Sequence, residues 1–188
     1  MSSSVTVVVL AGGTARRFGS DKLAALLPDG RSVLEHCLAG MPSAWPLVVV
    51  GPERPVPSEV ADRVRFVRET PAGGGPLAGI AAGVAVADGD VVCVAPGDTP
   101  RAGEVLPLLV GALDADPTVD AAVLSDAAGQ PNPVLAAYRT RALRAALPDV
   151  PTGAAARELL TLTHVEVRAP FPVHDVTTPA DLTDTGMG

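Results

Sequence analysis

The sequence predicts one α/β domain over residues 1–188, with three α/β/α layers and a mostly parallel sheet in the middle. Short apolar runs rich in valine recur along the chain, and such runs are typical of strands buried on both faces. Stretches with helical spacing separate these runs, which favours parallel strands joined by right-handed crossovers. A length of 188 residues suits one domain with a sizeable core, and no repeat or low-complexity tract divides it.

The first half of the chain is expected to contain four strands and two helices. Ser32 and Glu35 form the pattern of a capping box, which predicts that the first helix begins just after Ser32. The second helix is expected at residues 80–87, after a glycine-rich loop. The strands are expected at Val5–Leu10, Leu47–Val50, Val64–Val67 and 90–95.

The second half is expected to contain three strands and three helices. The strands are expected at 119–124, 130–138 and 163–168, and the helices at 104–115, 141–147 and 154–160. Proline has no N–H group to donate to a neighbouring strand. Pro131 and Pro133 therefore require that their strand lies at an edge of the sheet, or that both prolines occupy its first residues.

The composition is ordinary for a soluble globular protein and disfavours two classes of partner. A net charge of −7 argues against nucleic acid or an anionic membrane, and 3% aromatic residues leave little for base stacking. No apolar run approaches the roughly 20 residues of a membrane span, and the N-terminus lacks the basic start of a signal peptide. We therefore expect a cytoplasmic protein in which Cys37 and Cys93 are reduced core residues.

A loop rich in glycine and cations follows the first strand. Gly12, Gly13 and Gly19 allow backbone N–H groups to approach a ligand, and successive N–H groups form an anion-binding concavity. Arg16, Arg17 and Lys22 add the positive charge that a polyphosphate requires, and Lys22 is the only lysine in the chain. The loop therefore predicts a polyphosphate site.

Two common phosphate loops are excluded by the spacing. A P-loop needs lysine and then serine or threonine directly after its second glycine, whereas Gly19 is followed by Ser20, Asp21 and Lys22. A dinucleotide fingerprint needs a spacer between its first two glycines, whereas Gly12 and Gly13 are adjacent. A redox enzyme with a dinucleotide cofactor is therefore disfavoured.

The pattern L-A-G-G-x-x-x-R-[MF]-G-x-x-K in this loop resembles nucleotidyltransferases, and most closely the molybdenum cofactor guanylyltransferase and cytidylyltransferase group, which is MobA-like. The resemblance implies a Rossmann-like sheet of the nucleotide-diphospho-sugar transferase type. It also implies that Lys22 and Arg17 act on the phosphates during catalysis. The other nucleotide-binding residues that it implies in this loop are Leu10, Ala11, Gly12, Gly13, Thr14 and Arg16.

Two later segments resemble further motifs of the same family. The loop that begins at Glu69 is similar to the family's base- and ribose-binding loop, and the implied contacts are Glu69, Gly75, Pro76, Leu77 and Gly79. Backbone N–H groups at the start of the following helix suit anions or the edge of a nucleotide. Glu69 departs from the aspartate that is frequent in relatives.

The resemblance also implies a metal site built from two distant aspartates. Asp98 follows a predicted strand in the segment P-G-D-T-P, where the family holds a metal, and it is also expected to be catalytic. Asp175, in the tail D-V-T-T-P-A-D-L, is the second metal ligand that the resemblance implies. Thr177 and Ala180 depart from the family pattern there. Mg²⁺ suits the site because it takes few carboxylates and completes its shell with phosphate oxygens and water.

The function that these motifs imply is Mg²⁺-dependent transfer of GMP from GTP to molybdopterin, with release of pyrophosphate. The expected partners are GTP, a phosphate-bearing acceptor such as molybdopterin and a protein of molybdoenzyme maturation. Gln130 and Asn132 lie in a segment similar to the family's acceptor-side strand. Two alternatives stay open: a cytidylyltransferase that uses CTP, and a nucleotide-binding protein without catalysis, which the changes at Thr177 and Glu69 favour.

Overall fold

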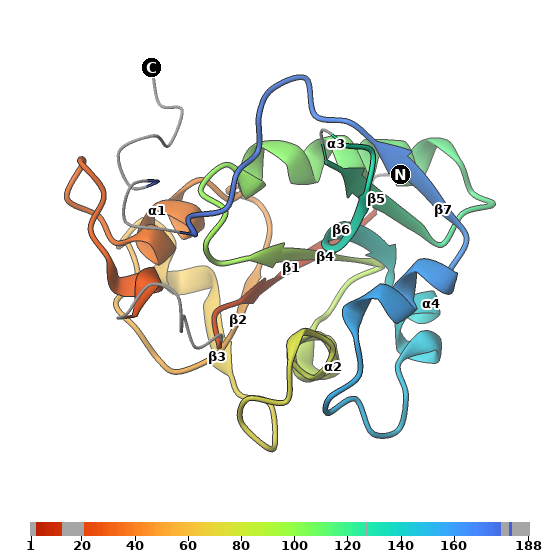
Figure 1. Ribbon diagram of the computed structural model, residues 1–188, viewed down its shortest axis with the longest axis horizontal. Helices are drawn as coiled ribbons and strands as arrows, with labels where there is room; N and C mark the ends of the chain where they lie inside the picture. The colour runs from red at the N-terminus through yellow and green to blue at the C-terminus, as the bar shows by residue number, and fades with distance from the viewer. Residues whose placement is uncertain (1–2, 13–20, 127, 178–180, 182–188) are drawn as a thin grey trace.

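A seven-stranded sheet of order β3-β2-β1-β4-β6-β5-β7 crosses the protein in the computed structural model, which describes residues 3–12, 21–126, 128–177 and 181 (Figure 1). The strands within these residues are β1 (Val5–Leu10), β2 (Leu47–Val50), β3 (Val64–Val67), β4 (Val91–Pro96), β5 (Ala121–Ser125), β6 (Pro131–Arg139) and β7 (His164–Val167). Neighbouring strands are parallel, except that β6 runs antiparallel to β4 and β5. The predicted mostly parallel sheet is confirmed.

Helices cover both faces of this sheet and give the three predicted layers (Figure 1). Val7 and Val9 of β1 point into a core shared with α1 (Val33–Ala39) and α3 (Ala102–Ala115). Val8 points to the opposite face, into a core shared with α2 (Pro76–Val86) and α4 (Thr140–Ala146). Successive residues of a strand face opposite sides, so the consecutive valines of β1 supply both cores. Among the described residues, no helix combines the length and apolar character needed to cross a membrane.

The helices begin and end close to their expected positions, with two differences. The predicted capping box is present, because the Ser32 hydroxyl accepts from the N–H of Glu35 and the Glu35 carboxylate accepts from the N–H of Ser32. Helix α2 begins at Pro76 instead of residue 80, because proline is well suited to the first helical position. The helix expected at 154–160 is a short 3₁₀ helix, η3 (Ala156–Thr161).

Strand β6 resolves the two arrangements that its prolines allowed. It lies inside the sheet, between β4 and β5, rather than at an edge. Pro131 pairs with Ser125 at the start of the strand, whereas pairing with β4 begins only at Ala136, opposite Val94. The prolines therefore lie in the first residues, beyond the part of β6 that is paired on both sides.

The sheet brings the carboxyl ends of β1 and β4 side by side. The last residue of β1, Leu10, pairs with the last residue of β4, Pro96. The segment after β1 carries Gly12, and the segment after β4 carries Asp98. Ligands of open α/β sheets bind outside the carboxyl ends of the strands, so this edge is the expected location of a site.

Candidate active site

A cleft of about 380 Å³ opens at the carboxyl ends of β1 and β4 and extends to the start of α2. It brings together seven of the predicted nucleotide-binding residues and the predicted metal ligand Asp98; the seven are Leu10, Gly12, Lys22, Glu69, Gly75, Pro76 and Gly79. Its lining also includes Leu23, Val50, Gly73, Pro96 and Val134, which the sequence did not single out. Segments far apart in the chain therefore meet in one concave site, which is the form expected of a small-molecule site.

Two of the predicted nucleotide-binding residues lie away from the cleft. Ala11 is fully buried, and its N–H donates a 2.8 Å hydrogen bond to the carbonyl of Val50. That N–H is therefore engaged by β2 and not free for a phosphate, which corrects the expectation for the Ala11 amide. Leu77 is also fully buried, in the core beneath α2. Gly13, Thr14, Arg16 and Arg17 lie outside the described residues.

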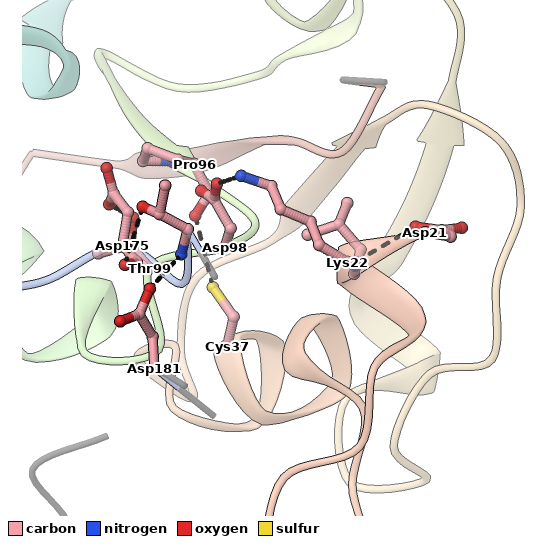
Figure 2. A network of polar contacts seen from close by, with 10 residues as sticks. Asp21, Lys22, Cys37, Pro96, Asp98, Thr99, Asp175 and Asp181 are labelled. Carbon is pink, nitrogen blue, oxygen red and sulfur yellow. Dashed lines mark hydrogen bonds and ion pairs between the residues drawn. The ribbon is translucent and has the colours of Figure 1, made fainter. Parts of the chain in front are cut away.

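Lys22 and Asp98 form an ion pair inside the cleft, through Nζ and Oδ2 (Figure 2). Lys22 is the first residue of a single 3₁₀ turn, η1 (Lys22–Ala24), and Asp21 caps this turn by accepting from the N–H of Leu23 at 3.2 Å. The Leu23 side chain is 4% exposed and anchors the turn in the core. Only 24% of the Lys22 side chain and 16% of the Asp98 side chain are exposed, so the pair is shielded from bulk water.

The tail of the chain is joined to the segment after β4 by two hydrogen bonds. The N–H of Val176 donates to the carbonyl of Asp98 at 2.8 Å. The hydroxyl of Thr99, which is fully buried, donates to Oδ1 of Asp175 at 2.5 Å (Figure 2). Burial raises the pKa of the Asp175 carboxyl, and the negative charge of Asp98 acts in the same direction. The structure thus places the two predicted metal ligands close enough to influence each other electrostatically.

Cys37 lies beneath these carboxylates. Its thiol donates to the carbonyl of Pro96 at 3.7 Å, and it comes from α1 (Figure 2). Burial first, and then the charges of Asp98 and Asp175, raise the pKa of the Cys37 thiol to about 12. The thiol therefore stays protonated at neutral pH, as expected of a reduced core cysteine.

Glu69 links the two glycine-rich segments of the cleft. Its Oε1 accepts a 3.0 Å hydrogen bond from the N–H of Gly73, in the loop before α2. The same oxygen also lies against Gly12, because a Cβ added there would be 3.2 Å away. The longer side chain of glutamate, compared with aspartate, thus still delivers its carboxylate to the cleft.

A second cavity, of about 840 Å³, lies beside the tail. Asp175 and the predicted acceptor-side residue Asn132 line it, whereas Gln130 does not. Arg168 and His174 also line it, and neither was predicted from the sequence. Neither belongs to a recognisable motif, so only the path of the tail along β5 and β6 reveals that they share a cavity.

The donor set at Asp98 and Asp175 fits a magnesium ion. Both side chains offer carboxylate oxygens, which are the hard ligands that Mg²⁺ prefers, and two carboxylates leave positions for phosphate and water. Among the described residues, no group of three or more histidine, cysteine, aspartate or glutamate side chains could hold a metal. A zinc site of the usual kind is therefore not formed by this part of the chain.

The sequence profile of the MobA-like NTP transferase domain matches residues 7–167. The chain belongs to this family. A Bacillus cereus (strain AH820) protein named "Probable molybdenum cofactor guanylyltransferase" is 32% identical over 143 residues, covering 71% of this chain and 68% of the relative. The molybdenum cofactor guanylyltransferase of Acidiphilium cryptum is 33% identical over 124 residues, or 60% of each chain.

Solved structures agree with this assignment to the MobA-like family. Molybdopterin-guanine dinucleotide biosynthesis protein A from Archaeoglobus fulgidus superposes with a TM-score of 0.69 at 25% identity, over 96% of both chains. The 2-C-methyl-D-erythritol 4-phosphate cytidylyltransferase of Francisella tularensis superposes with a TM-score of 0.71 at 15% identity, covering 95% of this chain and 96% of that one. The second likeness concerns the fold alone, which is of the predicted nucleotide-diphospho-sugar transferase type. By family, this MobA-like chain is an enzyme of the nucleotidyltransferase class.

Proposed function

We propose that this protein transfers GMP from GTP to molybdopterin in a Mg²⁺-dependent reaction that releases pyrophosphate. The observation that carries the proposal is the meeting of Lys22 and Asp98 in the cleft, with Asp175 held beside them by Thr99 and Val176. The names of the Bacillus and Acidiphilium relatives support the choice of donor and acceptor. Its compartment would be the cytoplasm, which the reduced, buried Cys37 and Cys93 support.

The reaction requires an acceptor phosphate oxygen to attack the α-phosphorus of the triphosphate. A new P–O bond forms there while the bond to the β-phosphate oxygen breaks, and pyrophosphate leaves. Little covalent chemistry is needed from the protein, so positioning and neutralisation of charge supply most of the catalysis. The Lys22 ammonium would leave Asp98 to bind phosphate oxygens, and Arg17 would assist it.

Asp98 and Asp175 would hold the magnesium ion. When bound, Mg²⁺ supplies positive charge to the phosphate oxygens and keeps the attacking and leaving groups in place. Asp98 lines the nucleotide cleft, whereas Asp175 lines the second cavity. The hydrogen bonds of Thr99 and Val176 would therefore hold the two carboxylates at the junction of the two cavities, where transfer must occur.

Glu69 supports guanine as the preferred base. Its carboxylate lies in the cleft between Gly12 and Gly73. Guanine offers two neighbouring N–H donors, on N1 and N2, and a carboxylate accepts such a pair with both oxygens. Cytosine offers one amino group on that edge, so a carboxylate discriminates in favour of guanine.

The second cavity is the proposed acceptor site. Arg168 can supply positive charge to a phosphate, and His174 and Asn132 can supply hydrogen bonds to the acceptor. Phe171 adds an apolar wall in the same cavity. A phosphorylated acceptor that carries a flat ring system, such as molybdopterin, fits this combination.

A turnover assay with the purified protein tests the proposal. Protein, Mg²⁺ and molybdopterin are incubated with GTP or CTP, and pyrophosphate and the dinucleotide product are quantified, with Asp98→Asn as the inactive control. The proposal predicts product with GTP that is lost in Asp98→Asn. Product with CTP alone would assign the protein to cytidylyl transfer, and no product with either nucleotide would contradict an active transferase.

A further inference from the structure

Arg54, which belongs to none of the sequence motifs, makes an ion pair with Asp21 at the edge of the cleft. It lies in the connection that follows β2, and its Nη1 donates to Oδ2 of Asp21. Only 16% of the Arg54 side chain is exposed, whereas 46% of the Asp21 side chain is exposed. The Nε of Arg54 is buried and has no hydrogen-bond partner within the described part of the chain. Burying a guanidinium costs stability, and within the described residues the carboxylate of Asp21 is the charged group that offsets this cost.

Asp21 uses its two carboxylate oxygens for two different contacts. Oδ2 pairs with Arg54, whereas Oδ1 accepts the N–H of Leu23 at 3.2 Å and caps the turn that begins at Lys22. The carbonyl of Asp21 also accepts from the N–H of Ala24 at 3.0 Å. Arg54 therefore holds the carboxylate that shapes this turn.

The turn itself is too short to be stable alone. It is a single 3₁₀ turn of three residues, and such turns depend on their surroundings for stability. One side is fixed by Leu23 in the core, and the other by Asp21 through Arg54. Lys22 lies between these two anchors and reaches Asp98.

We propose that Arg54 is a positioning residue, which fixes the Lys22 turn through Asp21 and so aims the Lys22 ammonium at Asp98. The positioning of Lys22 by Arg54 does not depend on the proposed function. Only its effect on triphosphate binding by Lys22 rests on the proposed function. Arg54 itself does not line the cleft, so it acts through Asp21 and not on the ligand. Loss of such an anchor displaces a binding group, and small displacements weaken a positioned site strongly.

The uniqueness of Lys22 allows a direct test without any nucleotide. Lys22 is the only lysine, so an amine-acetylating reagent modifies this side chain and the N-terminus, and mass spectrometry of the Lys22 peptide gives its rate alone. We expect Arg54→Met to raise the acetylation rate of Lys22 by up to about fivefold, the factor that corresponds to the upper end of the range measured for exposed ion pairs. Arg54→Lys should keep most of the protection, because an ammonium can still pair with Asp21.

Two further variants make the result decisive. Arg31→Met removes an arginine of the separate surface pair with Glu59, and should leave the rate unchanged. Asp21→Asn keeps a side-chain oxygen that can accept the N–H of Leu23, but it removes the negative charge that pairs with Arg54. If Arg54→Met does not fold, Asp21→Asn is measured in its place. Equal rates for Lys22 in the parent, Arg54→Met and Asp21→Asn would overturn the proposal.

GTP binding in the presence of Mg²⁺ then tests the consequence. Calorimetry is performed on the parent, Arg54→Met, Lys22→Ala and the double variant. Arg54→Met should weaken GTP binding about five- to tenfold in the parent background. It should have almost no effect in the Lys22→Ala background, because the ammonium that Arg54 positions is then absent. Equal weakening in both backgrounds would contradict a role through Lys22. A parent that binds no GTP would instead refute the proposed function, while the acetylation rates still decide the role of Arg54.

Discussion

The hydroxyl of Thr99 donates a 2.5 Å hydrogen bond to Oδ1 of Asp175, although 76 residues separate the two. Thr99 directly follows Asp98, so this bond and the bond from Val176 to the Asp98 carbonyl join the segment after β4 to the tail. A carboxylate from the middle of the chain and one from its tail are thereby held close together. Burial first, and then the nearby charge of Asp98, disfavour the ionised form of Asp175, and this cost leads to the first prediction.

We expect Asp175→Asn to unfold at a higher urea concentration than the parent at pH 7 in EDTA. Burial raises the pKa of the Asp175 carboxyl above its ordinary value of 3.8. Between that value and the raised one, the folded protein binds more protons than the unfolded chain, so stability falls as the pH rises through this window. The advantage of Asp175→Asn should therefore disappear below about pH 3.8, the unfolded value. Equal stability of the two proteins at pH 7 would contradict a destabilising ionised carboxylate.

Thr99→Val should destabilise the protein by about 1–2 kcal/mol, because it keeps the shape of the side chain but removes a buried hydrogen bond. The matched control is Thr118→Val, which removes a similar 2.6 Å bond to Asp116 on the exposed surface. We expect the control to change the free energy of unfolding by less than about 0.5 kcal/mol. Urea unfolding at pH 7 measures the free energy of unfolding of both variants. A similar decrease in Thr99→Val and Thr118→Val would show that the buried bond to Asp175 stabilises the protein no more than an exposed one.

Two helical glycines should respond in opposite directions to alanine. A Cβ at Gly83 in α2 would lie 2.4 Å from Cγ1 of Val8, so Gly83→Ala must push α2 away from β1. A Cβ at Gly111 in α3 would meet nothing within 4 Å. We expect Gly83→Ala to destabilise by about 1–3 kcal/mol and Gly111→Ala to stabilise by up to about 1 kcal/mol. Thermal unfolding tests the pair, and a stabilised Gly83→Ala would refute the close packing of α2 on the sheet.

Glu69→Gln should reduce selectivity for guanine. Glutamine keeps the length of the side chain and one carbonyl oxygen, but it replaces the second acceptor with a donor. We expect about tenfold weaker GTP binding, with CTP binding changed much less, as measured by calorimetry with Mg²⁺. An unchanged ratio of GTP to CTP affinity would remove Glu69 from base recognition.

The sequence was sufficient to predict the layers, the parallel strands and many of the residues that line the cleft at β1 and β4. Buried strands and glycine-rich loops are local patterns, and the carboxyl ends of parallel strands necessarily meet, so Gly12 and Asp98 could be placed together. Contacts between distant segments have no local signature. The engagement of the Ala11 amide by Val50 and the ion pair of Arg54 with Asp21 belong to this class.

The position of β6 shows the same limit. Pro131 and Pro133 allowed either an edge strand or an interior strand that begins with both prolines. Which arrangement forms depends on where β4 ends relative to β6. Strand β4 pairs with β6 only from Ala136 of β6 onward, so both prolines lie outside that pairing. The cavity beside the tail could not be predicted from the sequence either, because Arg168 and His174 come together with Asn132 only through the path of the tail.

We expect Lys22 and Asp98 to form a Mg²⁺-dependent GTP site. Calorimetry of GTP, CTP, ATP and UTP binding, with and without Mg²⁺, tests it directly on the parent and on Asp98→Asn. We expect that GTP binds most tightly, that Mg²⁺ strengthens the binding, and that Asp98→Asn abolishes the effect of Mg²⁺. GTP binding that is indifferent to both Mg²⁺ and Asp98, or no triphosphate binding at all, would contradict it.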